Sequence, residues 1–267
     1  MGLFSRAEKA PQKVPLPTVI PALCGTTVGA AYGAARTGGD FFEFLHLADR
    51  VLLIAMFDIA GKRAEALGVA ATIQQLLRTR AQSCIECSGN VNDALSSLVL
   101  ELNRGIIKAV GVHNCPAFIA ALEEETSILS YINAGHTPAL LKDSDGIEEL
   151  GAGGVPLGLF SHVVHDASMT VIEEGAVLLI PSRGILEAKS GSREFGIEGV
   201  RNELLRAEYA TASELTDRVV RAAEAFLEAP GFWGPRIPIP GFSDAEPNDM
   251  TAVALARPAA RASAAAS

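Results

Sequence analysis

The segment GGDFFEFLHLADRVLLIAMFDIAG, residues 38–61, decides the fold of this chain. Two apolar runs in it, Phe41 to Leu47 and Val51 to Phe57, have the length and the aromatic and β-branched content of strands. Only three residues separate the two runs, which is the length of a hairpin turn. We therefore expect an antiparallel hairpin with Asp40 at the start of its first strand and Asp58 at the end of its second.

Helices and further strands follow the hairpin along the chain. Apolar residues at three- and four-residue spacing predict helices over residues 62–83, 91–110, 194–207 and 213–227. Short apolar runs between turn signals predict the other strands: 26–34, 117–122, 128–133, 139–142, 169–172, 176–180 and 251–256. Many antiparallel strands with helix pairs between them predict an α+β fold, in which helices cover the outside of two stacked antiparallel sheets.

The domain organisation is expected to be simple. Residues 1–22 carry four prolines and no sustained periodicity, so we expect an extended N-terminal segment there. Residues 23–257 contain no linker or repeat and are expected to form a single domain, and the Ala- and Ser-rich residues 258–267 to form a tail.

Charge and hydropathy narrow the class of protein. The chain has 22 Lys and Arg against 31 Asp and Glu, a formal charge of −9, so nucleic acid is a poor partner and cations suit it better. No apolar run is long enough to span a bilayer, and the N-terminus lacks the apolar region of a signal peptide. We expect a cytoplasmic protein with no membrane contact; the sequence leaves its oligomeric state open.

Two acidic residues at strand ends, Asp40 and Asp58, are the first candidates for chemistry. Each lies next to glycines, and the hairpin brings both to one end of a sheet. Carboxylates that converge where the backbone turns are suited to hold a hard divalent cation. The alternative is that they only end the strands and cap the helix that starts near Lys62. From the residues alone, both interpretations stay open.

Six segments together resemble a known family. They are residues 38–43 and 57–62, then Asn133-Ala134-Gly135-His136-Thr137-Pro138, residues 153–158, Pro181-Ser182-Arg183-Gly184 and Asn248-Asp249-Met250-Thr251. In this order they resemble the SpoIIE and RsbU branch of the metal-dependent PPM (protein phosphatase 2C-like) serine/threonine phosphatases. The resemblance runs from about Gly38 to Ala256 and implies an α-β-β-α sandwich.

The resemblance also implies a chemistry. Family members hydrolyse phosphoserine or phosphothreonine, typically on anti-sigma-factor antagonists, with two Mn²⁺ or Mg²⁺ ions that activate a bridging water. Asp58 resembles the carboxylate that bridges the two metals, the carbonyl of Ile59 resembles the backbone ligand, and Asp40 resembles the carboxylate that supports the first metal. A phosphoprotein is the partner that this similarity implies.

Two positions depart from the family pattern. Arg183 stands where the Thr-Asp-Gly turn of the family has an aspartate that ligates the second metal, and Asn248 stands where the final motif has its first aspartate. Asn248 offers a neutral oxygen and Asp249 adds a charge nearby. We expect a weakened or lost second metal site. Arg183 then either points to solvent or takes the place of the metal and neutralises Asp58 or Asp249.

Other residues are weaker candidates. His136 follows a strand and is expected to be a hydrogen-bonded turn residue rather than an acid or a metal ligand. Residues 151–158 are glycine-rich but do not lead from a strand into a helix, which favours a plain turn over a phosphate cradle. Glu43 and Glu187 resemble acidic positions common in the family and are expected to support the site or to be solvated.

Aromatic and basic residues are the last candidates for contacts with a partner. Phe232 and Trp233, in a Pro- and Gly-rich loop before Asn248, are candidate substrate contacts or members of a loop folded on itself. Basic side chains over residues 62–80 are expected to form a solvated helix face.

Two functions therefore stay open from the sequence. The first is a metal-dependent protein serine/threonine phosphatase with a degraded second metal site. The second is a catalytically weak or inactive pseudophosphatase that binds a phosphoprotein as a regulatory module.

Overall fold

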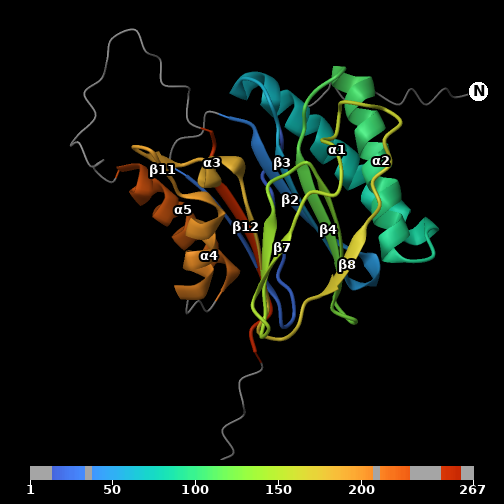
Figure 1. Ribbon diagram of the computed structural model, residues 1–267. Coiled ribbons are helices and arrows are strands. Elements are labelled where there is room, and N and C mark those ends of the chain that lie inside the picture. Colours follow the sequence, from blue (N-terminus) through green and yellow to red (C-terminus); the bar gives the residue numbers. More distant parts are fainter. Residues whose placement is uncertain (1–13, 34–37, 207–210, 229–247, 260–267) are drawn as a thin grey trace, which may run out of the picture.

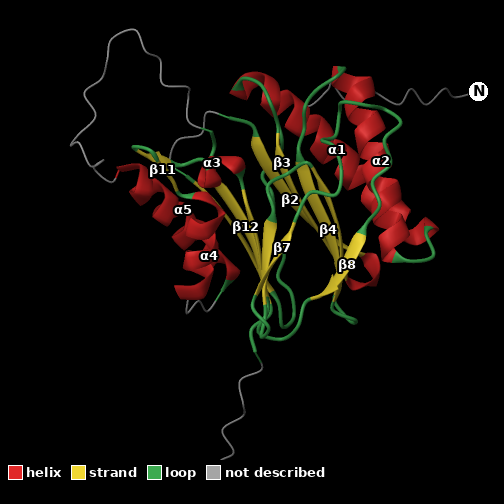
Figure 2. Ribbon diagram, viewed as in Figure 1, coloured by secondary structure: helices red, strands yellow, loops and turns green. Residues whose placement is uncertain are grey.

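A computed structural model describes residues 14–33, 38–206, 211–228 and 248–259 of the chain. Within these residues, ten strands form two five-stranded antiparallel sheets, and two further strands of two residues each pair as a small separate ribbon. The sheets lie face to face, with α1 and α2 outside one of them and α3, α4 and α5 outside the other (Figures 1 and 2). The predicted α+β sandwich of two antiparallel sheets flanked by helices is confirmed.

The first sheet has the strand order β2-β3-β4-β5-β8. Its elements and covering helices have these bounds: β2 Asp40–Leu47, β3 Val51–Asp58, α1 Arg63–Cys87, α2 Val91–Val110, β4 Ala117–Glu123, β5 Ile128–Ala134 and β8 Ser168–Val171.

The second sheet has the order β1-β12-β9-β6-β7. The bounds of this half are β1 Thr27–Tyr32, β6 Ala139–Lys142, β7 Ile147–Leu150, β9 Val177–Pro181, α3 Arg183–Leu186, β10 Lys189–Ser190, β11 Arg193–Glu194, α4 Gly196–Arg206, α5 Ala212–Glu228 and β12 Thr251–Ala256.

The β2–β3 hairpin forms as its sequence predicts. A three-residue 3₁₀ turn, η1 (Ala48–Arg50), closes it, and the register runs from Leu47 opposite Val51 to Asp40 opposite Asp58. Every residue of β3 from Val51 to Phe57 is buried, because the strand lies inside its sheet and the sheet is covered on both faces. The register fixes both aspartates at the same end of the sheet.

Three apolar layers hold the fold together. Alternate residues of β3 point to opposite faces. Leu52, Ile54 and Met56 belong to the layer between the sheets. Leu53 and Phe57 belong to the layer beneath α1 and α2. A third layer lies between β9, β12 and the helices α4 and α5.

Most predicted elements agree with the structure, and the differences have local causes. The first long helix continues beyond residue 83 to Cys87, because no breaker precedes Ser88 and Gly89. Strand β7 was not predicted, since its sequence IEEL lacks an apolar run; it pairs with β6 at the edge of its sheet and exposes both of its glutamates. No helix in the described part of the chain has the length and apolarity needed to cross a bilayer.

Candidate functional site at one end of the sandwich

Two carboxylates face each other across the β2–β3 pair. Asp40 begins β2 and Asp58 ends β3, and the register places them opposite each other. Asp40 is 7% exposed, and burial raises its pKa to about 8. The nearby hydroxyls of Thr251 and Ser182 oppose this rise in pKa, whereas the charges of Asp58 and Asp249 add to it. Asp40 is therefore largely protonated at neutral pH.

A third carboxylate, Asp249, comes from the other sheet. It lies two residues before β12 and is 2% exposed. Its Oδ1 accepts a hydrogen bond of 2.7 Å from the backbone N–H of Gly38, just before β2. Its backbone carbonyl accepts a hydrogen bond of 2.9 Å from the hydroxyl of Ser182, which in turn accepts one from the N–H of Thr251. The loop before β12 is thus fixed to both halves of the sandwich.

The guanidinium of Arg183 lies against this acidic group. Arg183 begins α3, directly after β9, and its Nε is 3.0 Å from Oδ2 of Asp58. Burial raises the pKa of Asp58, and the charge of Arg183 opposes that rise. The arginine side chain remains 48% exposed. Of the arrangements that the sequence left open, the structure has the one in which Arg183 pairs with Asp58.

Glycine is required beside this arginine. A Cβ on Gly184 would lie 2.2 Å from the backbone oxygen of Asp249 and 2.8 Å from that of Asn248. Such distances are shorter than any contact a real Cβ makes, so the start of α3 can approach the loop before β12 only with glycine at this position. Gly184 therefore sets how close Arg183 comes to the carboxylates.

Asn248 is turned toward a different group. Its Nδ2 donates a hydrogen bond of 2.8 Å to Oε2 of Glu187, and both side chains are exposed. The negative charge of Glu187 also raises the pKa of Asp58, so Glu187 borders the site. Asn248 was expected to offer an oxygen to a second metal; the structure shows its amide nitrogen bonded to a carboxylate.

Arg63 is a site residue that the sequence reasoning missed. The prediction of a solvated basic helix face is wrong here, because Nη1 of Arg63 lies 3.7 Å from Oδ2 of Asp249 and 3.3 Å from the carbonyl oxygen of Gly38. It is wrong for Arg78 as well, whose Nη2 is 3.0 Å from Oε2 of the buried Glu43. A signal existed for Arg63: a cation in the first turn of a helix opposes the helix dipole and calls for an acidic neighbour.

The backbone of Ile59 lies against the backbone of Gly39. The Ile59 N–H donates to the carbonyl of Gly39, at 3.2 Å, and a Cβ on Gly39 would lie 2.2 Å from the Ile59 oxygen. The backbone ligand that the family resemblance implies therefore lies directly against the Gly39 backbone.

His136 is buried near the same end of the sandwich. It is 4% exposed, and burial lowers its pKa to about 4, with the charge of Arg183 acting in the same direction. Its backbone N–H donates to the side chain of Asn133 and its Nδ1 lies 3.1 Å from the carbonyl oxygen of Thr137. His136 is neutral at physiological pH and has the local hydrogen bonds of a turn residue.

The remaining candidates lie elsewhere or outside the description. Glu43 is 2% exposed and is bonded to Gln74 and Arg78 of α1. Residues 151–158 form irregular turns that lead into no helix, as predicted. Phe232 and Trp233 lie outside the described residues.

The contacts of the acidic side chains bear on whether a pair of divalent cations could bind at this site. Such ions need several anionic oxygens that converge on one point. Here Oδ2 of Asp58 is paired with Arg183, and the amide nitrogen of Asn248 donates a hydrogen bond to Glu187. Within the residues that the structure describes, no group of three or more His, Cys, Asp or Glu is arranged to hold a metal ion.

The fold and the order of the site segments define the class of the protein as a PPM, or protein phosphatase 2C-like, domain. The family model described as Stage II sporulation protein E (SpoIIE) matches residues 48–231, more than half of the chain, and this protein belongs to that family. The family consists of PPM serine/threonine phosphatases, which are hydrolases that use Mn²⁺ or Mg²⁺.

Individual relatives share the fold at low sequence identity. Protein IcfG of Synechocystis sp. is 25% identical over 228 residues; the match covers 76% of this chain and 35% of IcfG, so the chain spans about a third of that relative. The RsbU and RsbW domains of Rv1364c from Mycobacterium tuberculosis match with a TM-score of 0.66 and 23% identity, over 91% of this chain and 62% of that one.

The PP2C phosphatase domain of SpoIIE from Bacillus subtilis, solved with a fragment of its regulatory domain, gives a TM-score of 0.65 at 16% identity. This match covers 86% of the present chain and 63% of the other. Identities this low establish the fold alone.

Proposed function

We propose that this SpoIIE-family domain binds a phosphoserine or phosphothreonine protein and hydrolyses it weakly or not at all, so that it acts as a pseudophosphatase. The observation that carries the proposal is the ion pair between Arg183 and Asp58, at 3.0 Å. In the family resemblance, Asp58 is the carboxylate that bridges two metals and Arg183 replaces an aspartate ligand. A fixed cation of the protein therefore stands where a mobile cation would be needed.

Electrostatics favours the arginine over a metal at this place. A divalent ion 4 Å from a guanidinium is repelled by about 8 kcal/mol at an effective dielectric constant of about 20. Arg183 is part of the chain, so it stays next to Asp58 whatever the concentration of free metal ions.

The same arrangement favours a phosphate. Guanidinium groups bind phosphate oxygens through paired N–H donors, and their planar shape fixes the orientation of the anion. Two of them border the site, Arg183 on Asp58 and Arg63 beside Asp249, and both side chains keep about a third or more of their surface exposed. Binding of a phosphorylated side chain therefore needs no metal here.

The partner we propose is a phosphoprotein of a partner-switching pathway, such as an anti-sigma-factor antagonist. Support comes from the family and from the M. tuberculosis relative, in which RsbU and RsbW domains occur in one protein. The net charge of −9 makes nucleic acid an unsuitable partner. We also propose that the protein acts in the cytoplasm.

A slow metal-dependent phosphatase is the second candidate function, with one Mn²⁺ or Mg²⁺ ion retained. The observation that favours it is the retention of Asp40, Asp58 and Asp249 at one end of the sandwich. In this case the ligands would be Asp40, Asp58 and the Ile59 carbonyl, supplemented by Asn248 or Asp249.

One experiment separates the two functions. Mn²⁺ is titrated by calorimetry, and hydrolysis of an aryl phosphate with Mn²⁺ is measured, for the natural protein and for the double variant Arg183→Asp with Asn248→Asp. We expect no Mn²⁺ binding and little turnover by the natural protein, and a rate at least tenfold higher for the variant. The control, Arg80→Asp with Asn202→Asp, makes the same change in charge at exposed positions on α1 and α4. A natural protein that binds Mn²⁺ and turns over as fast as the variant would be a phosphatase.

A further inference from the structure

A pocket of about 350 Å³ adjoins the site. Residues 14–18, the start of β2 and the first two turns of α1 line it, and most of its lining side chains are apolar. Asp40 and Arg63 belong both to this pocket and to the acidic site. A ligand in the pocket therefore lies next to the arginine that borders Asp249. The volume is at the lower end of the range for ligand pockets.

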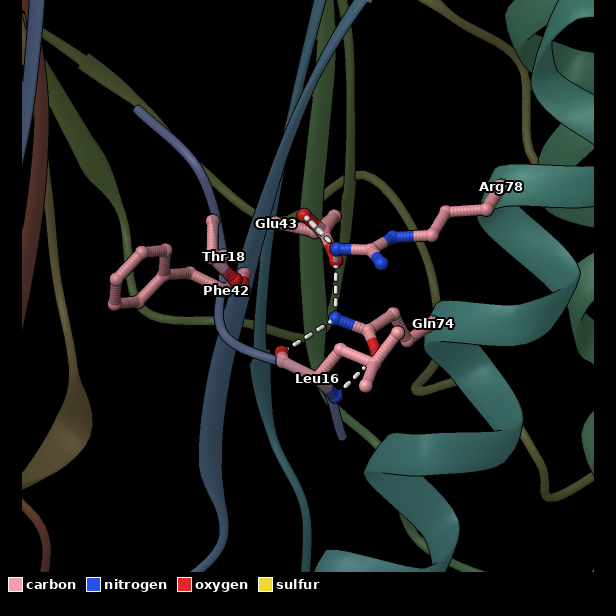
Figure 3. A network of polar contacts seen from close by, with 6 residues as sticks. All are labelled: Leu16, Thr18, Phe42, Glu43, Gln74 and Arg78. Atoms are coloured by element: carbon pink, nitrogen blue, oxygen red, sulfur yellow. Dashed lines mark hydrogen bonds and ion pairs between the residues drawn. The ribbon is translucent and has the colours of Figure 1, made fainter. Parts of the chain in front are cut away.

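The outer wall of the pocket comes from an extended segment, residues 14–20, which we name the N-terminal strap and of which residues 14–18 line the pocket. Figure 3 shows how it is held: the N–H of Leu16 donates to Oε1 of Gln74 at 2.7 Å, and Nε2 of Gln74 donates to the carbonyl of Leu16 at 2.9 Å. Two residues further on, the hydroxyl of Thr18 donates to the carbonyl of Phe42 at 2.8 Å. On the strap, these three bonds use the main chain of Leu16 and the hydroxyl of Thr18, so none of them involves a large strap side chain.

A buried polar network fixes the amide that holds the strap. Gln74 is 1% exposed, and its Nε2 also donates to Oε2 of Glu43 at 2.5 Å. Arg78 donates to the same carboxylate at 3.0 Å. Because an ionised carboxylate only accepts hydrogen bonds, Glu43 keeps the amide nitrogen on its own side and leaves the amide oxygen to accept from Leu16. The main chain of the strap therefore stays in place whatever its side chains contact.

The strap exposes an apolar edge next to the pocket that Arg63 lines. The exposed fractions are 55% for Val14, 52% for Leu16, 72% for Val19 and 47% for Ile20. Four large apolar side chains exposed within seven residues are more than scattered surface residues, and such strips mark interaction surfaces. Val14 and Leu16 belong both to this edge and to the lining of the pocket, which also includes Arg63.

We propose that the strap and its pocket are a docking site for an apolar side chain that flanks the phosphorylated serine of the partner, while Arg63 and Arg183 bind the phosphate. The inference rests on the proposed function, because it assumes that the phosphorylated residue lies at the two arginines. Its support is the continuity of the two surfaces: one ligand with a doubly negative group next to an apolar side chain matches the cations at one end and the apolar wall at the other.

Calorimetry with two synthetic phosphoserine peptides tests the docking site. The peptides differ only in the residues on each side of the phosphoserine, which are leucine in one and glycine in the other. We expect the natural protein to bind the leucine peptide at least tenfold more tightly. Leu16→Ser removes an exposed side chain and keeps the backbone bonds to Gln74, and we expect this preference to fall below threefold. Leu205→Ser, at a 61% exposed leucine of α4 in the other half, is the matched control and should keep the full preference.

The possible outcomes distinguish a failure of the docking site from a failure of the proposed function. Equal binding of the two peptides by the natural protein would overturn the docking site and leave the proposed function standing. Binding of neither peptide would overturn the proposed function and the docking site with it. A full leucine preference in both Leu16→Ser and a second variant, Leu67→Ala on the α1 wall, would place the apolar contact elsewhere and refute the assignment.

Discussion

Replacing Asp40 by asparagine tests the electrostatics of the site through folding stability. In the folded protein the pKa of Asp40 is raised to about 8, mainly by burial, from an ordinary value of 3.8. Between these two values the unfolded chain holds Asp40 ionised while the folded chain holds it protonated. Stability from this group is therefore fully present below pH 3.8 and is lost as the pH rises through 8.

The size of the effect follows from the proton balance. One proton of difference between the folded and unfolded states changes the free energy of unfolding by about 1.4 kcal/mol per pH unit, so about 4 kcal/mol is lost between pH 5 and pH 8. The asparagine side chain of the Asp40→Asn variant carries no titrating proton. The free energy of unfolding of Asp40→Asn, relative to that of the natural protein, should rise by about this amount over the same pH range.

Urea unfolding at half-unit steps from pH 5 to pH 8, extrapolated to water, provides the measurement. Asp145→Asn, in the exposed turn before β7, is the control for loss of a carboxylate charge and should run parallel to the natural protein. A constant difference between Asp40→Asn and the natural protein, within about 1 kcal/mol across this range, would show that Asp40 is not held protonated and would refute the reasoning.

Two further predictions concern packing and a buried charge. Gly184→Ala forces a Cβ to within 2.2 Å of the Asp249 backbone, so thermal unfolding should show a loss of about 2 kcal/mol or more in the free energy of unfolding. Gly68→Ala, in α1 with open space around it, is the control and should be neutral or stabilising. Equal effects of the two changes would contradict the close approach at Gly184. Glu43→Ala removes the buried carboxylate that accepts from Gln74 and Arg78, and should lower the free energy of unfolding, measured in urea, by about 3 kcal/mol. Arg78→Ala should lower it by less in the Glu43→Ala background than in the natural protein; equal losses in both backgrounds would show that the two side chains are not coupled.

The sequence predicts the fold well where a pattern is local. The β2–β3 hairpin needed only two apolar runs and a short turn, and its register followed from the turn length, so Asp40 and Asp58 were correctly expected at one sheet end. Strand β7 was missed because an edge strand with one solvated face has little hydrophobic signal. The C-terminal end of α1 lies beyond the predicted one, because sequence patterns define the ends of helices poorly.

The site was harder to predict because its contacts join distant segments. The pairing of Arg63 with Asp249 joins the start of α1 to the loop before β12. A cation in the first turn of a helix indicates an acidic neighbour, but no short-range pattern identifies that neighbour as Asp249. Arg183 was identified only because the family resemblance implies an aspartate at its position. Its pairing with Asp58 joins the start of α3 to the end of β3, two segments that no local pattern connects.

The two ion pairs of the site cross between the halves of the sandwich in opposite directions. Arg183 follows a strand of one sheet and meets Asp58 of the other, whereas Arg63 follows Asp58 along the chain and meets Asp249 of the first sheet. During synthesis, the β2–β3 hairpin can place Asp40 opposite Asp58 long before the ribosome has added Arg183 or Asp249. The newly made N-terminal half thus carries its acidic pair without Arg183, and the finished site arises only when the second sheet docks on the first.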